Sequence, residues 1–562
     1  MSAEELSARG RIASRLVNMA TKFRVLLVYP CRDVDSHVRT QFSQEQIHGL
    51  LVWPFRIRSY GLAFNGLETL AALTPDWVDL TVANENLDTI DFDGAYDLVA
   101  MTVMVTNATR ACQIADRFRN RGVKVVMGGY YPYMVSDHAL NHADAICASE
   151  AEHVWGEMLA DARDGRLKRI YEQPEKTDMS LVTHLPRPDR VRWMRHVSLT
   201  LQASRGCPFD CEFCSIVVML GHTMRYKKPE AVVAELERIY QNDLMGRIAR
   251  RPIFFVDDNI FGNPTQFKEI CRAIIRLNKR YPRFHACFGS QLTINVTKDK
   301  DALSLMREAG FYNIFIGLES TSVDVLKSYK KFHNVAFDYD EAVSRMREYG
   351  MEVIASFIFG TDAETTDCFD AAFDFFDRNN VLYPYFNILT PIGKQWKRYL
   401  MEGRLLTVKP RLYDAHHTVF VPMKMRPIEL QKGFIDLVDR VLSYEQIKKR
   451  LLGAASTQVN RRMIMSRIAE MTLYYKIAAT LKLKGDAEGL RFVNDLKPHI
   501  QRGAISMASV LIQLDQHDFA VRNRLTLDEH RYNLDVPAWE DRPQPAAHEE
   551  GSIAAEVAAS VR

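Results

Sequence analysis

Short apolar runs alternate with amphipathic segments in the first quarter of the chain. "FRVLLVYP" (23–30) is a β-branched and apolar run that ends at a proline, as expected of a buried parallel strand that leads into a loop. Strand-like runs follow at 79–84, 97–104 and 123–132, and apolar residues recur at helical spacing in 61–75 and 107–122. The alternation predicts an α/β domain with a doubly wound parallel sheet.

A second alternating region begins at "HVSLTLQASRG" (196–206). Its later strand candidates are 251–259, 284–292, 312–320, 351–360 and 382–391, with helix-period segments between them. Six successive strand and helix units predict a partial (β/α)6 parallel barrel. In such a fold we expect the active site at the carboxyl ends of the strands.

The alternation stops near residue 396, and 426–520 has a helical pattern with only two prolines. The last residues are rich in proline, alanine and charge, which predicts disorder. We therefore predict an N-terminal leader (1–22), a Rossmann-type domain (23–155), a connector (156–196), the barrel (197–395), a mainly helical region (396–533) and a disordered tail (534–562).

Composition narrows the class of protein but names no partner. Of 562 residues, 47% are hydrophobic and 25% charged, and 73 basic against 70 acidic residues give a net charge of +3. These values fit an ordinary globular protein and give no reason to expect nucleic-acid binding. Because no signal peptide or membrane-spanning stretch stands out, we expect a cytoplasmic protein. Six isolated cysteines suit buried free thiols better than disulfides: Cys31, Cys112, Cys147, Cys271, Cys287 and Cys368.

The other three cysteines are clustered in "SRGCPFDCEFCSI" (204–216). Cys207, Cys211 and Cys214 have the spacing C-x3-C-x2-C. A structural zinc site usually has two separated ligand pairs, and although His222 is near, no second pair follows. An iron–sulfur cluster is the better fit, because three thiolates would leave one iron of a four-iron cluster open to a substrate or cofactor.

This loop resembles the hallmark of the radical S-adenosylmethionine (radical SAM) enzymes, which have this spacing after a strand and an aromatic residue before the third cysteine, here Phe213. The resemblance implies a 4Fe-4S cluster whose open iron binds the amino and carboxylate groups of SAM. Reductive cleavage of SAM then yields a 5'-deoxyadenosyl radical, with electrons from an external reductant such as flavodoxin or ferredoxin.

Several strand ends extend the resemblance. "FFVDDNIFGN", "IGLES" and "SFIFGTDAET" resemble segments that follow the second, fourth and fifth strands in the family. By this resemblance the residues expected around SAM, with Phe213, are Asp257, Asp258, Asn259, Gln291, Glu319, Ser320 and Gly360. Helix capping or ordinary loop chemistry is the alternative for each.

The first domain is similar to the cobalamin-binding modules that precede the barrel in one subgroup of the family. Gly128, Gly129 and Tyr131, in "VVMGGYYPY", are the candidate cobalamin contacts, and a tight turn would need the same glycines. The Asp-x-His-x-x-Gly motif that supplies a histidine to cobalt elsewhere is absent, because "DSHVRT" (35–40) has threonine in place of glycine. The alternative is a domain with a purely structural role.

The domain order over about residues 23–525 resembles a subgroup that includes hopanoid methylases. The chain departs from that pattern at "PIGKQWKRYLMEGRLL" (391–406), where relatives commonly read "PGTPLY". The basic and apolar segment 461–484 could meet a membrane surface and admit a lipid, or cover the barrel as an ordinary helix.

These features lead to three hypotheses. The first is a radical SAM enzyme that uses cobalamin to methylate an unactivated carbon of a hydrophobic or polycyclic small molecule, for example one that is lipid-like or isoprenoid-like. The second keeps the radical step but forms a ring or a carbon–carbon bond without methyl transfer. The third is a non-catalytic cofactor-binding protein in which the cluster is vestigial or replaced by zinc.

Overall fold

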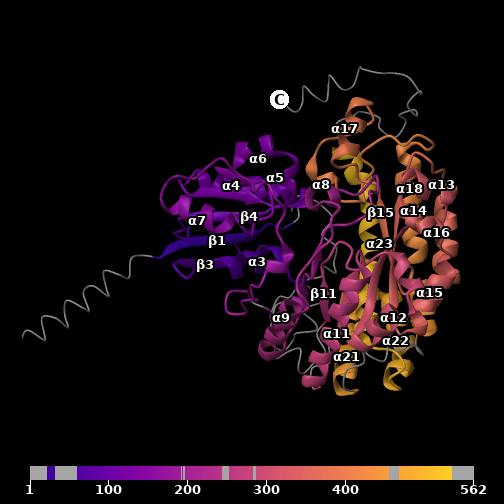
Figure 1. The fold of residues 1–562 in the computed structure, drawn as a ribbon. Helices are drawn as coiled ribbons and strands as arrows, with labels where there is room; N and C mark the ends of the chain where they lie inside the picture. The colour runs from indigo at the N-terminus through magenta and orange to yellow at the C-terminus, as the bar shows by residue number, and fades with distance from the viewer. Residues whose placement is uncertain are drawn as a thin grey trace, which may run out of the picture. The chain divides into compact units, whose positions relative to one another are not determined.

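The computed structural model describes residues 22–31, 60–191, 193, 196–243, 252–282, 287–454 and 467–533. These residues form two compact units, each described here by itself (Figure 1). The first unit contains residues 22–31, 66–177 and 189–191, and the second contains the other described residues.

The first unit has a parallel sheet in the order β3-β1-β4-β5-β6-β7. Its strands are β1 (Phe23–Tyr29), β3 (Val78–Asn84), β4 (Leu98–Thr102), β5 (Lys124–Gly128), β6 (Ala145–Cys147) and β7 (Ile170–Tyr171). Helices α3 (Asn65–Leu73), α4 (Ala108–Arg119), α5 (Tyr130–Met134), α6 (Ser136–His142) and α7 (Trp155–Arg163) connect or flank them. The strand order reverses beside β1, which confirms the doubly wound sheet that the alternation predicted.

An apolar core of the first unit lies between the sheet and helix α4. Central strands contribute buried residues such as Val28, Val99 and Val125, and α4 contributes Ile114 and Phe118. The unit extends further along the chain than the alternation suggested. Helix α7 and strand β7 lie within the predicted connector 156–196, and β7 has only two residues, too few for any periodic signal.

The second unit has an open sheet of seven parallel strands, in the order β15-β14-β13-β12-β11-β8-β2. They are β2 (Tyr60–Leu62), β8 (His196–Leu201), β11 (Pro252–Phe255), β12 (Cys287–Gln291), β13 (Phe311–Glu319), β14 (Glu352–Phe359) and β15 (Tyr383–Ile388). The last six are the predicted barrel strands, and the partial barrel is confirmed. Strand β2 was not expected, since three residues that pair with β8 at the sheet edge carry no pattern of their own.

Helices alternate with these strands, and several of them begin at a residue whose side chain caps the helix. They are α9 (Pro229–Asn242), α11 (Pro264–Arg280), α12 (Lys300–Ala309), α13 (Val323–Ser328), α14 (Phe332–Val335), α15 (Tyr339–Glu348) and α16 (Asp367–Arg378). Asn263 accepts a hydrogen bond from the Gln266 amide before Pro264, and Asp299 caps α12 in the same way. Phenylalanines fill the interior, among them Phe255, Phe288, Phe311, Phe357 and Phe375.

The C-terminal part of the second unit is helical, as predicted. Its helices are α17 (Lys394–Met401), α18 (Pro427–Val441), α19 (Tyr444–Ala454), α21 (Arg467–Lys484), α22 (Ala487–Gln501) and α23 (Met507–Asn533). Leu473, Ile477 and Leu481 of α21 are buried in a core with residues of α19, α22 and α23, as a covering helix requires. Leu483 of the same helix remains 88% exposed. The predicted leader (1–22) up to residue 21 and the tail (534–562) lie outside the described residues.

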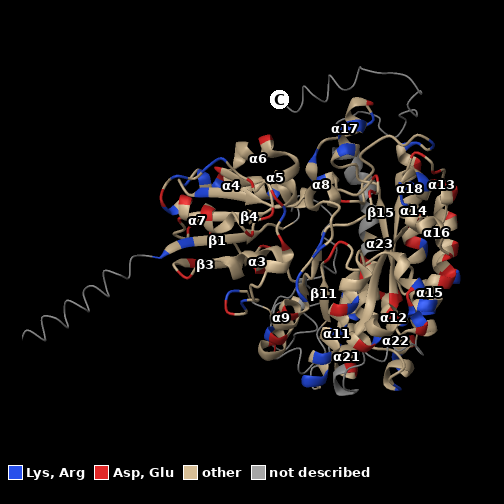
Figure 2. Ribbon diagram, in the orientation of Figure 1, with Lys and Arg blue, Asp and Glu red and all other residues tan. Residues whose placement is uncertain are grey.

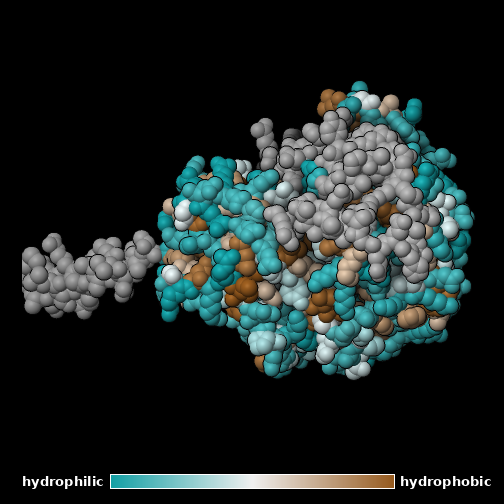
Figure 3. Space-filling model, turned by 90° about the horizontal axis from the view of Figure 1, so that it is seen from above, coloured by the Kyte–Doolittle hydropathy of each residue, from teal (hydrophilic) through white to brown (hydrophobic). Residues whose placement is uncertain are grey.

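Charged side chains of both signs occur on the described part of the chain. Basic and acidic residues are interspersed over both units (Figure 2), in keeping with the near-balanced composition. On the face drawn in Figure 3, hydrophilic residues dominate and hydrophobic ones form small separate areas. Among the described residues, no helix is long and apolar enough to cross a membrane.

Candidate active site

The three clustered cysteines lie on one loop that a small antiparallel ribbon closes at its base. Strands β9 (Ser204–Arg205) and β10 (Arg225–Tyr226) pair on either side of the loop, directly after β8. Gly206 has φ 95°, and a Cβ there would lie 2.6 Å from the Thr223 carbonyl oxygen. Glycine is therefore required at the start of the loop, one residue before Cys207.

The segment after β11 holds the first part of this loop. Asp257 accepts hydrogen bonds from the backbone amides of Ala203 (3.1 Å) and Ser204 and from the Ser204 hydroxyl (2.6 Å). Asp258 accepts from the Gly206 amide at 3.4 Å. Asn259 donates through Nδ2 to the Cys207 sulfur at 3.8 Å. Three consecutive side chains thus contact three successive parts of the approach to Cys207, a function that the capping alternative did not include.

Burial changes the acidity of these two aspartates. Desolvation raises the pKa of Asp257 to about 7 against the hydrogen bonds from Ser204 and Ala203, which lower it. Burial also raises the pKa of Asp258 to about 6. Strong pKa shifts in one cluster of strand-end residues are typical of functional sites.

Glu319, at the end of β13, forms a buried ion pair with Lys331. Lys331 Nζ donates to Glu319 Oε1 at 2.7 Å, and the residues are 6% and 4% exposed. The pairing of β13 with β14 shifts register between Gly317 and Glu319. The backbone of Glu319 has a φ of 66°, which is a strained conformation for a residue other than glycine. Burial alone would lower the pKa of Lys331, but Glu319 raises it above its ordinary value, so the amine is charged.

The ion pair lies beside the cysteine loop. Lys331 Nζ is 5.5 Å from the centroid of the Phe213 ring, and Phe213 packs edge-on against Tyr329 at 4.9 Å. Burial raises the pKa of Cys211 to about 11 and of Cys214 to about 12, and the charge of Lys331 acts against both shifts. A buried cation next to buried thiols favours thiolates, which are the form that binds metal. No motif in the sequence pointed to Lys331.

The end of β14 turns sharply at Gly360. Its φ is 105°, and a Cβ there would lie 2.8 Å from the Leu430 side chain and 3.2 Å from Phe420. Packing within the chain is thus enough to require glycine here, independently of the expected place of Gly360 beside SAM. Glu364 accepts hydrogen bonds from the Gly360 and Thr361 amides at 2.7 and 2.9 Å, and burial raises its pKa to about 7.

Two further predicted residues lie at neighbouring strand ends. Gln291 is half-buried at the end of β12, and its carbonyl oxygen accepts from the Ile260 amide at 3.1 Å. Ser320 is buried, and its hydroxyl accepts from the Ser322 amide at 3.1 Å, at the start of α13. The strand ends therefore bring the predicted residues to one edge of the sheet, as the parallel fold requires.

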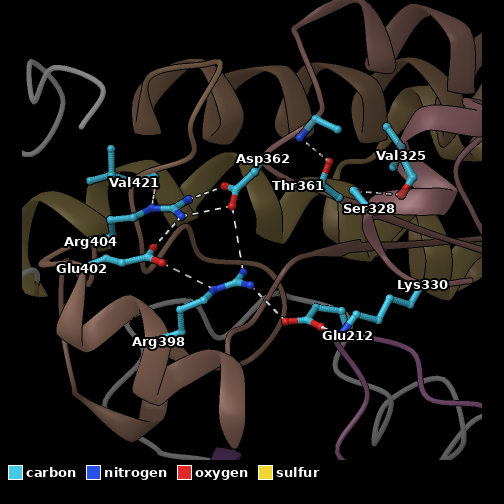
Figure 4. Close-up of polar contacts among 11 residues, drawn as sticks. Glu212, Val325, Ser328, Lys330, Thr361, Asp362, Arg398, Glu402, Arg404 and Val421 are labelled. Atoms are coloured by element: carbon cyan, nitrogen blue, oxygen red, sulfur yellow. Dashed lines mark hydrogen bonds and ion pairs between the residues drawn. The ribbon is translucent and has the colours of Figure 1, made fainter. Parts of the chain in front are cut away.

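A network of ion pairs joins the cysteine loop to the segment 391–406 that departs from the family pattern (Figure 4). Glu212, between Cys211 and Phe213, contacts Lys330 at 2.8 Å and Arg398 of α17 at 3.0 Å. Its pKa is lowered, first by Lys330 and then by Arg398. Asp362 pairs in turn with the buried Arg404. The divergent segment thus supplies a cation to the loop, which sequence reasoning missed because the partners are 186 residues apart.

The predicted cobalamin contacts lie after β5 in the first unit. Gly129 has φ 96°, and a Cβ there would lie 2.9 Å from the Val103 carbonyl oxygen, while one at Gly128 would lie 3.4 Å from Cys147 Cβ. Tyr131 is buried in the core of the unit. The group that approaches Gly129 closely enough to require glycine is therefore the backbone of Val103 in the same chain. The segment 35–40, with Asp35 and His37, lies outside the described residues.

The residues beside the cysteine loop fit two of the cofactors that the resemblance implies, the iron–sulfur cluster and SAM. Three thiols share one loop beside a charged lysine, and soft sulfur ligands suit an iron–sulfur cluster. Glu319 Oε2 is buried and, among the described residues, has no hydrogen-bond partner. A buried carboxylate oxygen without a donor is ready to accept a hydrogen bond from a hydroxyl or amino group such as SAM carries.

Comparisons with known proteins agree with this geometry. Residues 201–376 match the model of the Radical SAM superfamily. The chain is 30% identical over 393 residues to bacteriochlorophyllide d C-12(1)-methyltransferase of Chlorobaculum tepidum, covering 68% of this chain and 83% of that protein. It is 28% identical to hopanoid C-2 methylase of Rhodopseudomonas palustris, covering 77% and 86%. Its fold resembles TsrM of Kitasatospora setae, a radical SAM methyltransferase solved with cobalamin and a [4Fe-4S] cluster (TM-score 0.57, 14% identity, 82% of this chain and all of that one).

Proposed function

Because this chain belongs to the radical SAM superfamily, we propose that it cleaves SAM reductively and uses the resulting radical to methylate an unactivated carbon with the help of cobalamin. The observation that carries the proposal is the joint placement of the cysteine loop, the Asp257–Asn259 segment and the Glu319–Lys331 pair at one edge of the second sheet. The methyltransferase relatives support the type of reaction.

Cys207, Cys211 and Cys214 would hold the cluster, and Glu319 with Gln291, Ser320 and Gly360 would surround SAM. When bound, the cluster supplies the electron that cleaves SAM, and methylcobalamin supplies the methyl group. Asp257 and Asn259 act through the loop: they hold the backbone before Cys207 and the sulfur of Cys207 itself. They are positioning residues for the cluster.

The buried Lys331 contributes charge. A cation close to thiolates stabilises them, and it also offsets the negative charge that an added electron brings. Glu319 in turn stabilises Lys331, and its second oxygen is available to orient a bound donor group. This pair therefore links the electrostatics of the cysteine loop to the recognition of SAM.

For the substrate, we propose a hydrophobic molecule with a ring system. Two of the similar methyltransferases act, by their names, on a bacteriochlorophyllide and on a hopanoid. A pocket lined mainly by apolar side chains could accept large ring systems of this kind. The divergent segment that supplies Arg398 would then adjust the rim of the site to this chain's own substrate.

Anaerobic reconstitution tests the first step. We expect about four irons per chain, an electron paramagnetic resonance signal of a reduced cluster, and 5'-deoxyadenosine and methionine from SAM under reduction. Protein that binds iron but never cleaves SAM would contradict the proposal. Protein that takes up zinc in place of iron at the three cysteines would support the non-catalytic alternative.

A second measurement separates methyl transfer from ring formation. Incubation with candidate tetrapyrroles and polycyclic lipids should yield a methylated product together with S-adenosylhomocysteine, and only when the protein carries cobalamin. Formation of 5'-deoxyadenosine and a new product without S-adenosylhomocysteine would favour ring or carbon–carbon bond formation.

A further inference from the structure

A second set of metal-ligating side chains lies in the first unit, away from the cysteine loop. It consists of Cys112 on α4 and of His138 and His142 on α6. The Cys112 sulfur and one ring nitrogen of each histidine lie within 4.8 Å of one another. The sequence suggested only a core role for Cys112, because its two histidine neighbours are more than 25 residues away along the chain.

The helices explain why these side chains meet. His138 and His142 are four residues apart on α6, so both project from the same face of the helix. Helix α6 packs on α4, and the two imidazole rings are 5.2 Å apart between centroids. Two histidines at this spacing with a third ligand from a neighbouring element form a recurrent frame for a metal ion.

The Nδ1 atom of each imidazole is within hydrogen-bond distance of a neighbouring side chain. His142 Nδ1 is 2.9 Å from both carboxylate oxygens of Asp116, which is one turn after Cys112 on α4. His138 Nδ1 is 2.8 Å from the hydroxyl of Tyr131, which is buried. Because Nδ1 of each ring is engaged by Asp116 or by Tyr131, Nε2 is the ring nitrogen left to bind a metal ion. A carboxylate behind a histidine is the usual outer partner of a zinc ligand.

Zinc binds a cysteine as its thiolate, so binding at Cys112 would release the thiol proton to solvent.

We propose that Cys112, His138 and His142 bind one Zn²⁺ ion, with a water molecule or another small ligand in the fourth position. One thiolate and two imidazoles are a donor set that zinc accepts in tetrahedral geometry. Such an ion would fasten α6 to α4 directly after the turn that contains Gly129 and Tyr131. The proposal does not depend on the proposed function of the second unit.

Metal content is the first test. The full-length chain with Cys207, Cys211 and Cys214 replaced by alanine, produced without cobalamin, removes the other thiolate site. After treatment with chelator and dialysis against Zn²⁺, we expect about one zinc per chain by plasma mass spectrometry. Cys112→Ser and His138→Ala in this background should lose the zinc. Cys147→Ala, a buried cysteine of the same unit, is the matched control and should keep it.

Co²⁺ gives an independent readout. The parent should develop thiolate charge-transfer and tetrahedral d–d absorption, and Cys112→Ser should abolish the charge-transfer band. Zinc should also raise the melting temperature of the parent and leave that of His138→Ala unchanged, since a ligand that binds only the folded state stabilises it. His138 is exposed, so this variant should fold even if Cys112→Ser does not.

The proposal is overturned if the parent retains no zinc, or if Cys112→Ser and His138→Ala retain as much as Cys147→Ala does. Equal Co²⁺ spectra for the parent and Cys112→Ser would overturn it as well, because a site without the thiolate is a different site.

Discussion

The strand ends beside the cysteine loop and the turn after β5 of the first unit differ in the groups that fill them. In the second unit, polar side chains after β11 and β13 contact the cysteine loop or lie beside it, and one of their oxygens, Glu319 Oε2, has no partner among the described residues. In the first unit, the turn after β5 is filled by its own chain, with Gly129 against Val103 and Tyr131 in the core. A strand end that leaves polar atoms unpaired is prepared for a ligand, whereas one that satisfies itself is explained by folding alone.

The largest expected effect is the loss of a cluster ligand. Cys207→Ala, Cys211→Ala or Cys214→Ala should abolish SAM cleavage and reduce the bound iron strongly, since each supplies one of three thiolates. Cys271→Ala is the matched control, because Cys271 is fully buried on α11 and away from the loop. Iron content and 5'-deoxyadenosine formation measure the result. Equal iron in Cys207→Ala and Cys271→Ala would contradict the assignment.

The buried ion pair should come next. Lys331→Met leaves the Glu319 carboxylate buried without its cation, which we expect to destabilise the second unit by about 3–5 kcal/mol. The double variant Lys331→Met with Glu319→Gln should recover part of that loss. Chemical denaturation followed by a probe in the second unit measures both.

A matched pair separates the stability effect of Lys331 from its effect on the loop. Lys227 and Glu235 are buried to a similar degree, and Lys227→Met should cost a similar free energy. Of these two lysines, only Lys331 is among the groups that act on the pKa of Cys211 and Cys214. We therefore expect a lower reduction potential of the reconstituted cluster in Lys331→Met and no change in Lys227→Met. An equal shift in both variants would remove the special role of Lys331.

The third effect depends on pH. The pKa of Glu364 in the folded chain is about 7, above its ordinary value of 4.5. The folded state therefore holds this proton more tightly, and the resulting stabilisation is complete below pH 4.5 and lost as the pH rises through 7. Glu364→Gln should remove this part of the dependence, worth about 3 kcal/mol. Unfolding curves at several pH values measure it, and parallel wild-type and variant profiles would argue against the shifted pKa.

The fourth effect examines the first unit. Gly129→Ala should destabilise it by about 2 kcal/mol, from the positive φ and the contact with Val103. Gly122→Ala, also at positive φ but with no atom within 4 Å of the added Cβ, is the control and should cost less. If Gly129 is purely structural, the loss appears in protein without cobalamin. A loss seen only as weaker cobalamin binding would show that the turn serves the cofactor.

The smallest effect concerns the divergent segment. Arg398→Ala should change stability by less than about 1 kcal/mol, because the side chain is 40% exposed and screened by solvent. The cluster should nevertheless be lost faster on exposure to air, since Glu212 loses one of its two cations. Lys424→Ala removes a basic side chain of the same unit that donates to the Ala363 carbonyl oxygen, and it should leave the rate unchanged. Identical rates of cluster loss in the two variants would show that segment 391–406 does not stabilise the cysteine loop.

The sequence by itself determined the two alternating regions, the helical C-terminal part and the chemistry of the cysteine loop. Strand and helix periodicity are local properties of consecutive residues, and three cysteines within eight positions are a local pattern as well. Asp257 and Glu319 were expected around SAM through the resemblance of their segments to the radical SAM family, and periodicity alone did not single them out.

Only the tertiary structure decided which partner each of these residues has. Lys331 beside Glu319, Arg398 beside Glu212, and Cys112 between two histidines are contacts between segments that lie far apart or carry no motif of their own. Strand β2 joined the second sheet through three residues with no period. Such pairings depend on how helices and strands pack, and on which groups burial leaves charged, neutral or unpaired. Neither property can be predicted from the residues of one segment alone.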